Sequence, residues 1–317
     1  MQKGASHFKT FPEFTKLTLA DREMYEGLTI RFPPTIQFSF PALLLWWGVI
    51  DDCLVSELNG NLVFSLWVPG MEKDSGFSVL GDKLIDETFC EIFDLQKRQG
   101  KSARIVHTPD FVIRNCKYPD MFKFTSEPGY DEPIVSVKDF SSIEGLPLAK
   151  RRHVRSYLVE FDEKNIEVKP IDIDKMHNKE ILVDLINVWA PAGPLNDYAR
   201  YEELGLRKAI ELGSDIGMSC IGLYIDGRIH SFFMYEEIKD ARQVNMGYTR
   251  FSYEYPHLVD MSLYEFAKWL EARQVEFVNL DSDLGLEVLR TLKVSLAPSR
   301  FVKMYTINPT TGKKYHD

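Results

Sequence analysis

Alternating apolar and polar positions predict two similar β-hairpins in this chain. One spans CLVSELNGNLVFSLWVPG and turns at Asn59-Gly60, and the other spans CIGLYIDGRIHSFFMY and turns at Asp226-Gly227. Both dipeptides accept the positive φ angles that a two-residue hairpin turn requires. The turns lie 167 positions apart, from Gly60 to Gly227. This spacing indicates a repeated unit.

The segments that follow the two hairpins also match. Each hairpin is followed by a helix with one apolar face, a short strand, a turn with an acidic residue, a short helix and a closing strand that carries a lysine. These features are predicted at residues 83–99, 103–107, Asp110 and Lys123 in the first half, and at residues 258–273, 277–280, Asp283 and Lys303 in the second.

The repeated order predicts two copies of one α/β (α+β) unit. We place the domains at residues 1–145 and 146–317, with the join near residues 140–150. A length of 317 residues agrees with two domains, because it is long for a single core. The alternative is one mixed α/β chain in which two hairpins match by chance.

The most apolar stretch, FSFPALLLWWGVI, covers residues 38–50. It is shorter than the roughly 20 residues that a helix needs to span a bilayer. We therefore expect a buried core helix, with contact at a membrane surface as the alternative, and no transmembrane segment.

Charge and cysteine content limit the partners and the compartment. Acidic residues outnumber basic ones by 47 to 38, which gives a net charge of −9 and opposes binding to duplex DNA. The four cysteines lie far apart, so neither a zinc site nor a disulfide framework is expected from them. The N-terminus also lacks the apolar core of a signal peptide. These features predict a cytoplasmic protein.

Two helical segments carry candidate substrate-binding residues. The first, LAKRRHVRSYLVEF, contains Arg151 and Arg152, which could bind phosphate groups. The second, DYARYEELGLRK, places Glu203 and Arg207 at i and i+4. The alternatives are a solvated basic face for the first segment and a plain surface ion pair for the second.

Several sequence motifs are missing. The chain has no GxxxxGK[ST] or GxGxxG phosphate loop, no GxSxG nucleophile elbow and no HExxH. No two of its seven histidines have the spacing of metal ligands. We therefore expect no metal site.

The densest group of chemically useful residues is the segment EFVNLDSDLGLEVLRTLKVSLAPSRFVKMY. A strand brings Asn279, Asp281 and Asp283 to one face, and the next helix carries Arg290 and Lys293 at i and i+3. A carboxylate here could orient or deprotonate an acceptor, and a cation could bind phosphate or an oxyanion. The alternative is structural: Asp283 caps the helix and Asp281 pairs with a cation.

This C-terminal segment resembles the signature of bacterial proteins related to the phosphatidylglycerol lysyltransferase C-terminal domain. Three further segments resemble that family: IEGLPLAKRRHVRSYLVEF, FSFPALLLWWG and the turn at Pro69-Gly70. The matching residues are Asn279, Asp281, Asp283, Leu284, Gly285, Leu289, Arg290, Lys293 and Pro298, together with Gly145, Arg151, Arg152 and Phe161.

The resemblance implies two tandem GNAT-like acyltransferase domains, each a mixed, mostly antiparallel sheet flanked by helices. It also implies transfer of an acyl group from aminoacyl-tRNA or acyl-CoA to an amine or hydroxyl acceptor, such as a lipid head group or a small molecule. Possible partners are then tRNA or a phospholipid head group. On this basis Asp281, Asp283 and Lys293 are catalytic candidates, and Asn279, Arg290, Glu203, Arg207, Arg151 and Arg152 are substrate-binding candidates.

Two departures from the family pattern keep a second hypothesis open. Only Arg250 could stand near the position of the family's lysine after the C-terminal hairpin. The Arg/Gln-x-x-Gly-x-Gly/Ala loop that binds the CoA pyrophosphate in GNAT enzymes is also missing. The alternative is a non-catalytic module on the same fold that binds a ligand or a partner.

Overall fold

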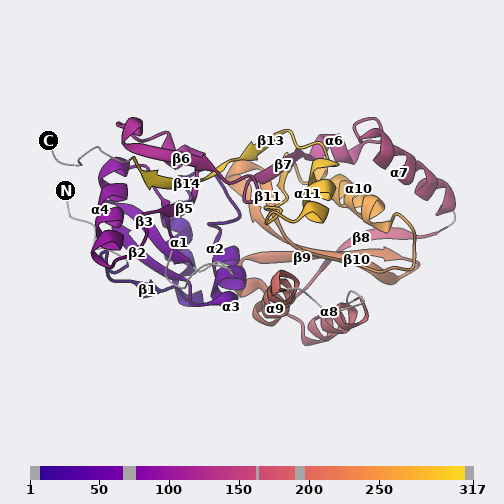
Figure 1. Ribbon diagram of the computed structural model, residues 1–317. Helices are drawn as coiled ribbons and strands as arrows, with labels where there is room; N and C mark the ends of the chain where they lie inside the picture. The colour runs from indigo at the N-terminus through magenta and orange to yellow at the C-terminus, as the bar shows by residue number, and fades with distance from the viewer. Residues whose placement is uncertain (1–7, 67–75, 162–163, 190–196, 311–317) are drawn as a thin grey trace. The chain divides into compact units, whose positions relative to one another are not determined.

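The computed structural model describes residues 8–66, 76–161, 164–189 and 197–310 (Figure 1). The predicted Pro69-Gly70 turn lies outside these residues. The chain forms two compact units. The first unit contains residues 1–33, 38–131 and 302–317, and the second contains residues 34–37 and 132–301.

Each unit is built on a seven-stranded mixed sheet. The first sheet has the order β1-β2-β3-β4-β5-β14-β6 and the second the order β13-β7-β12-β11-β10-β9-β8. The strands of the first sheet are β1 (Thr15–Lys16), β2 (Leu54–Leu58), β3 (Asn61–Leu66), β4 (Gly76–Leu80), β5 (Ile105–Pro109), β14 (Met304–Pro309) and β6 (Phe122–Ser126). Those of the second are β13 (Arg300–Val302), β7 (Glu132–Ser136), β12 (Phe277–Asn279), β11 (Gln243–Phe251), β10 (Arg228–Ile238), β9 (Met218–Ile225) and β8 (Ile166–Ile171).

The two sheets have the same pairing pattern, which confirms the predicted repeat. In each sheet a run of antiparallel strands ends in one parallel pair, β4 with β5 or β11 with β12. The predicted hairpin turns are present: φ is 54° at Asn59 and 79° at Gly60, and 50° at Asp226 and 79° at Gly227.

The closing strands differ from the prediction that each half completes its own sheet. The predicted strand FVKMYT is interrupted at Lys303: β13 joins the second sheet, and β14 lies between β5 and β6 of the first. Asp131 holds this break, because its carboxylate accepts hydrogen bonds from Lys303 Nζ at 2.7 Å and from the Met304 amide at 2.9 Å. The prediction was wrong because an apolar strand can pair in either sheet, and local sequence does not choose between them.

The predicted helices are present with small shifts at their ends. The helices of the first unit are α1 (Arg22–Thr29), α2 (Phe40–Ala42), the π-helical turn Leu43–Trp47, α3 (Gly48–Ile50), α4 (Ile85–Arg98) and α5 (Asp110–Ile113). In the second unit they are α6 (Val137–Ser141), α7 (Leu148–Glu160), α8 (Met176–Val188), α9 (Asp197–Leu212), α10 (Leu258–Glu271) and α11 (Glu287–Val294). The described residues also form four short 3-10 turns: Leu19–Asp21, Pro119–Met121, Gly213–Ile216 and Lys239–Ala241.

The apolar stretch at residues 40–50 forms a continuous helical segment, as predicted. It buries Leu43, Leu45 and Trp47 in the first unit. Within the described ranges, no helix combines the length and apolar character needed to cross a bilayer.

Adjacent side chains of β10 pack on opposite faces of the second sheet. The ring of Phe233 stacks on Phe266 of α10 with centroids 4.6 Å apart, whereas Phe232 stacks on Trp189, which follows α8, at 6.2 Å. Side chains in a strand point alternately to the two faces, so one strand anchors helices on both sides. Accordingly, α7 and α10 cover one face and α8 and α9 the other (Figure 1).

Candidate functional site

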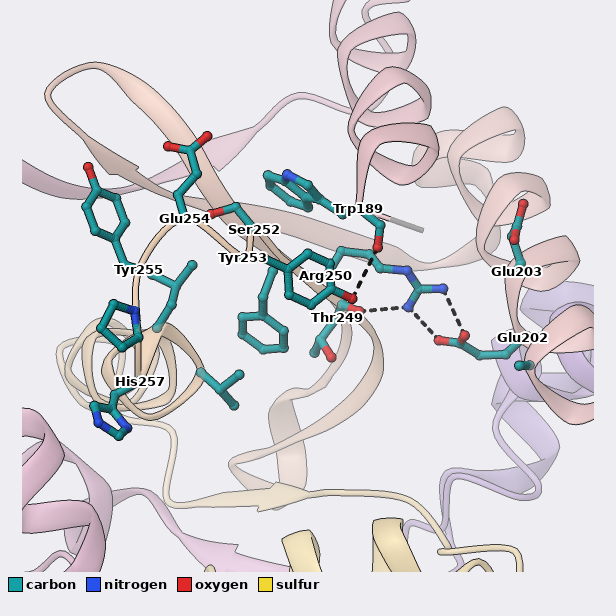
Figure 2. Close-up of a pocket in the computed structure, with 15 residues that line it drawn as sticks. Trp189, Glu202, Glu203, Thr249, Arg250, Ser252, Tyr253, Glu254, Tyr255 and His257 are labelled. Carbon is teal, nitrogen blue, oxygen red and sulfur yellow. Dashed lines mark hydrogen bonds and ion pairs between the residues drawn. The ribbon is translucent and has the colours of Figure 1, made fainter. Parts of the chain in front are cut away.

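The second unit contains a cavity of about 640 Å³ near the start of α10 (Figure 2). β11 ends at Phe251 and α10 begins at Leu258, and the segment between them forms one wall. The lining residues are Trp189, Ala199, Glu202 and Glu203, together with the continuous run 249–259. The cavity therefore lies where a strand end meets a helix N-terminus, a common place for ligands in α/β folds.

An ion pair fixes one wall of the cavity. Arg250 of β11 donates from Nη1 and Nη2 to the two carboxylate oxygens of Glu202 on α9, at 2.7 and 2.8 Å (Figure 2). Arg250 Nη1 also donates to the Thr249 carbonyl oxygen at 2.8 Å. A bidentate pair of this kind restricts both side chains, so the Glu202 carboxylate is held in one orientation.

Aromatic rings and further carboxylates line the rest of the cavity. Tyr253 donates a long hydrogen bond of 3.5 Å from its hydroxyl to the Trp189 carbonyl oxygen. The Tyr255 hydroxyl accepts a hydrogen bond from Lys164 Nζ at 3.1 Å. Glu254 lies 3.6 Å from Arg228 in an exposed ion pair. The lining thus combines the faces of several rings with acidic groups.

The predicted site residues of the C-terminal segment, which we call the C-terminal group, lie close together in the structure. Their charged side chains bind one another or neighbouring backbone atoms: Asp281, Asp283, Arg290 and Lys293. Arg290 donates from Nε and Nη2 to the Asp283 carboxylate at 3.0 and 3.1 Å. Lys293 Nζ donates to the backbone carbonyl oxygens of Asp281 and Ser282, at 3.0 and 2.5 Å. None of these side chains is among the residues that line the cavity.

Asn279 connects this group to a buried carboxylate that sequence reasoning missed. Its side-chain amide donates to Glu132 at 2.7 Å, and Glu132 also accepts from the backbone amides of Ile36 and Gln37, at 3.0 and 2.9 Å. Glu132 is fully buried. Burial raises the pKa of Glu132 to about 7, and the Asp281 carboxylate adds to the rise.

Asp281 interacts electrostatically with this buried carboxylate. Burial raises the pKa of the Asp281 carboxyl, which the charge of Lys293 partly offsets. Burial also raises the pKa of Tyr248, and the carboxylates of Glu202 and Asp281 both contribute to that rise. Tyr248 is therefore within electrostatic reach of both the cavity wall and the C-terminal group.

The other predicted site residues are distributed over three places. Glu203 lines the cavity and accepts a hydrogen bond of 2.9 Å from Arg207, as their i, i+4 spacing predicted. Arg151 donates to the carbonyl oxygens of Glu144 and Leu146 at 2.7 and 3.1 Å. Arg152 is exposed on α7. The structure therefore does not gather these four arginine and glutamate side chains into one site.

Sequence reasoning missed most of the cavity. Trp189, Glu202, Tyr253, Tyr255 and His257 belong to no recognisable motif. The aromatic density of the segment Ser-Tyr-Glu-Tyr-Pro-His, placed between a strand and a helix, was a signal that could have found part of it. Among the described residues, one group of side chains could hold a metal ion: His153, His257 and Asp260.

Comparison with known proteins places this geometry in context. The family described as "Phosphatidylglycerol lysyltransferase, C-terminal" matches residues 99–308. No curated protein matches the sequence. The fold resembles a conserved protein of unknown function from Bacteroides thetaiotaomicron, with a TM-score of 0.77 and 19% identity over 94% of this chain and 99% of the other.

Two further solved structures are also similar in fold. L-PGS from Bacillus licheniformis has a TM-score of 0.58 and 15% identity, and the match covers 93% of each chain. FemX has a TM-score of 0.53 and 10% identity, and the match covers 92% of this chain and 96% of that one. These identities support the fold alone. The two matching sheet topologies confirm the predicted pair of tandem α/β domains, each a mixed, mostly antiparallel sheet flanked by helices.

Proposed function

The chain belongs to the phosphatidylglycerol lysyltransferase C-terminal family, and from this premise we propose that it transfers an aminoacyl group from aminoacyl-tRNA to an amine or hydroxyl acceptor. The observation that carries the proposal is the cavity beside α10, with its acidic and aromatic lining. Its volume of about 640 Å³ lies in the range typical of small-molecule sites.

The lining suits a donor that carries a positive charge. An aminoacyl ester has an α-ammonium group, and the lysyl group named in the family has a second one. Glu203 and Glu254 place carboxylates near the cavity, each of them paired with an arginine, and Trp189 and Tyr253 supply aromatic faces. Cations are stabilised both by carboxylates and by the faces of aromatic rings.

The same segment is poorly suited to acyl-CoA. A CoA pyrophosphate needs free backbone N–H groups and positive charge at the helix N-terminus. Pro256 lacks an N–H, and Glu254 adds negative charge to the segment that leads into α10. Acyl-CoA is therefore the weaker donor candidate, although it remains a useful comparison ligand.

In the proposed reaction, a lone pair of the acceptor attacks the ester carbonyl carbon of the donor. The bond to the tRNA ribose oxygen then breaks, and that oxygen leaves with a proton. Although neither carboxylate lines the cavity, we propose Asp281 or Asp283 as the group that orients the acceptor and accepts its proton, since the pKa of Asp281 is raised. Lys293 and Arg290 would stabilise the oxyanion or a donor phosphate. Arg151 and Arg152 would bind a tRNA end or a lipid phosphate.

The partnered state of the C-terminal group favours one alternative function. Arg290 is engaged by Asp283, and Lys293 is engaged by two backbone carbonyls. A non-catalytic module that binds the same class of ligand in the cavity would need no free base.

The two functions are separated by one pair of measurements. The wild-type protein and Asp281→Asn are tested for binding to a non-hydrolysable lysyl-tRNA analogue and for transfer of labelled lysine to phosphatidylglycerol or a small amine. Transfer by the wild type that Asp281→Asn abolishes, with binding retained, supports the enzyme. Binding without transfer supports the module, and absence of both overturns the proposal for the cavity.

Filling the cavity should weaken donor binding at least tenfold. Ala199 of α9 lines the cavity, and a tryptophan there would occupy space that the donor needs. We expect the dissociation constant for the lysyl-tRNA analogue to rise in Ala199→Trp, as measured by filter binding or thermal shift.

The neighbouring residue provides the control for this prediction. Arg200 is exposed on the same helix and does not line the cavity, so Arg200→Trp adds the same ring at a different place. Equal affinities of Ala199→Trp and the wild type would show that the donor binds elsewhere.

A further inference from the structure

Beside the cavity, two helices bring together three metal-binding side chains. His153 lies on α7, and His257 and Asp260 lie at the N-terminal end of α10. One ligand atom from each residue lies within 4.8 Å of the other two. His153 and Asp260 are 107 positions apart in the sequence, so the fold creates this group.

The carboxylate of Asp260 is buried and held by two partners. One oxygen, Oδ1, accepts a hydrogen bond from Lys150 Nζ at 2.6 Å. The other, Oδ2, lies 2.5 Å from Nδ1 of His153. Lys150 thus fixes the orientation of the carboxylate and leaves Oδ2 directed toward the imidazoles. Metal-binding carboxylates are commonly oriented by a second hydrogen-bonding group in this way.

His257 completes the group and is not explained by an ordinary ion pair. Its ring stacks on the His153 ring with centroids 3.7 Å apart and planes 16° apart. In the part of the chain that the structure describes, its ring nitrogens have no hydrogen-bond partner, and the side chain is exposed. The contacts of Asp260 with Lys150 and His153 would be complete without it. A metal site gives this second imidazole a role, because the ion would bind one of its ring nitrogens.

We propose that His153, His257 and Asp260 bind one divalent transition-metal ion, with zinc as the best match. Zinc accepts imidazole nitrogen and carboxylate oxygen, and three protein ligands leave a fourth position for water or another molecule. Metal coordination requires neutral imidazoles, and two neutral rings can stack without charge repulsion. The nitrogen lone pairs of two stacked rings do not point at one ion, so metal binding requires the exposed His257 ring to rotate out of the stack.

The site would have two consequences for the molecule. The ion would connect α7 to the start of α10, adding to the link between Lys150 and Asp260. Because His257 also lines the cavity, a ligand bound there could reach the fourth coordination position. The inference does not depend on the proposed transfer reaction, because it rests only on the three candidate metal ligands and their geometry.

The test is a zinc titration of the tag-free, chelator-treated protein by calorimetry, repeated with cobalt to read the coordination geometry from its visible spectrum. We expect one zinc ion per chain and a cobalt spectrum typical of four-coordinate nitrogen and oxygen ligands. His257→Ala should weaken zinc binding at least 100-fold. His177→Ala, which removes an exposed histidine from α8, is the matched control and should bind zinc as the wild type does.

The outcome is decided by His257→Ala, because this side chain is exposed and its removal leaves the link between Lys150 and Asp260 intact. Circular dichroism and thermal melting without metal verify that the variant is folded. No stoichiometric zinc binding by the wild type would overturn the proposal. Binding that survives His257→Ala, or that is lost equally in His177→Ala, would also overturn it. Donor binding is measured separately, so failure of either proposal can be recognised.

Discussion

Replacing Lys293 by methionine should lower the free energy of unfolding by about 3–5 kcal/mol. Its ammonium group donates to the carbonyl oxygens of Asp281 and Ser282. Burial lowers the pKa of Lys293, and the carboxylates of Asp281, Asp283 and Glu132 oppose that change. Methionine keeps most of the side-chain length but leaves two carbonyls without their donor and the carboxylates of Asp281 and Glu132 without this cation, whereas Asp283 keeps its ion pair with Arg290.

Urea unfolding at pH 7 measures this effect. The control is Lys268→Met, because Lys268 is half exposed on α10 and pairs with Glu265 at 3.0 Å. A surface pair of this kind contributes at most about 1 kcal/mol. A loss in Lys293→Met no larger than in Lys268→Met would contradict a structural role for Lys293. If the folded variant binds donor but transfers nothing, the catalytic role proposed for Lys293 gains support.

Replacing Glu132 by glutamine should make stability less dependent on pH. Burial raises the pKa of Glu132 from its ordinary value of 4.5 to about 7. The folded protein therefore holds this proton more tightly than the unfolded chain does. The resulting stability is present in full below about pH 4.5 and is lost as the pH rises through 7. At about 1.4 kcal/mol per pKa unit, the loss is about 3 kcal/mol.

The measurement is the difference in unfolding free energy between the wild type and Glu132→Gln at pH 4.5 and at pH 8. Relative to Glu132→Gln, we expect the wild type to lose about 3 kcal/mol of unfolding free energy between pH 4.5 and pH 8. Glutamine cannot titrate, but it places an amide opposite backbone donors, so a constant loss is also expected. Only the pH-dependent part tests the raised pKa. The same difference at both pH values would show that Glu132 titrates as an ordinary carboxyl; exposed Glu271→Gln controls for general pH effects.

Local patterns predicted the elements of this fold well. The hairpins at Asn59-Gly60 and Asp226-Gly227 depend on φ angles that few residues accept, so neighbouring residues decide them. The faces of α4 and α10 depend on apolar spacing within one helix. The strand exchange of β14 was not predictable in this way, because pairing between β14 and β5 joins segments almost 200 positions apart.

The candidate site also contains both features that local sequence predicts and features that depend on distant parts of the chain. The ion pair of Glu203 and Arg207 follows from spacing along one helix. Glu132, in contrast, reaches Asn279 from 147 positions away, and its raised pKa follows from burial that no motif encodes. The expectation of no metal site considered spacing along the sequence, whereas His153 reaches Asp260 across 107 positions. Charge and burial at such places become visible only when the fold is known.

The interruption of the last strand at Lys303 also sets the order in which the two sheets are completed during synthesis. β6 has β14 as its neighbour in the first sheet, and β14 separates it from β5. The ribosome makes β6 early and β14 only after every strand of the second sheet has been made. Domains generally fold as their residues emerge. The half of the protein that is translated first therefore completes its sheet last, and a released chain truncated before residue 304 would contain every strand of the second sheet but lack β14 of the first.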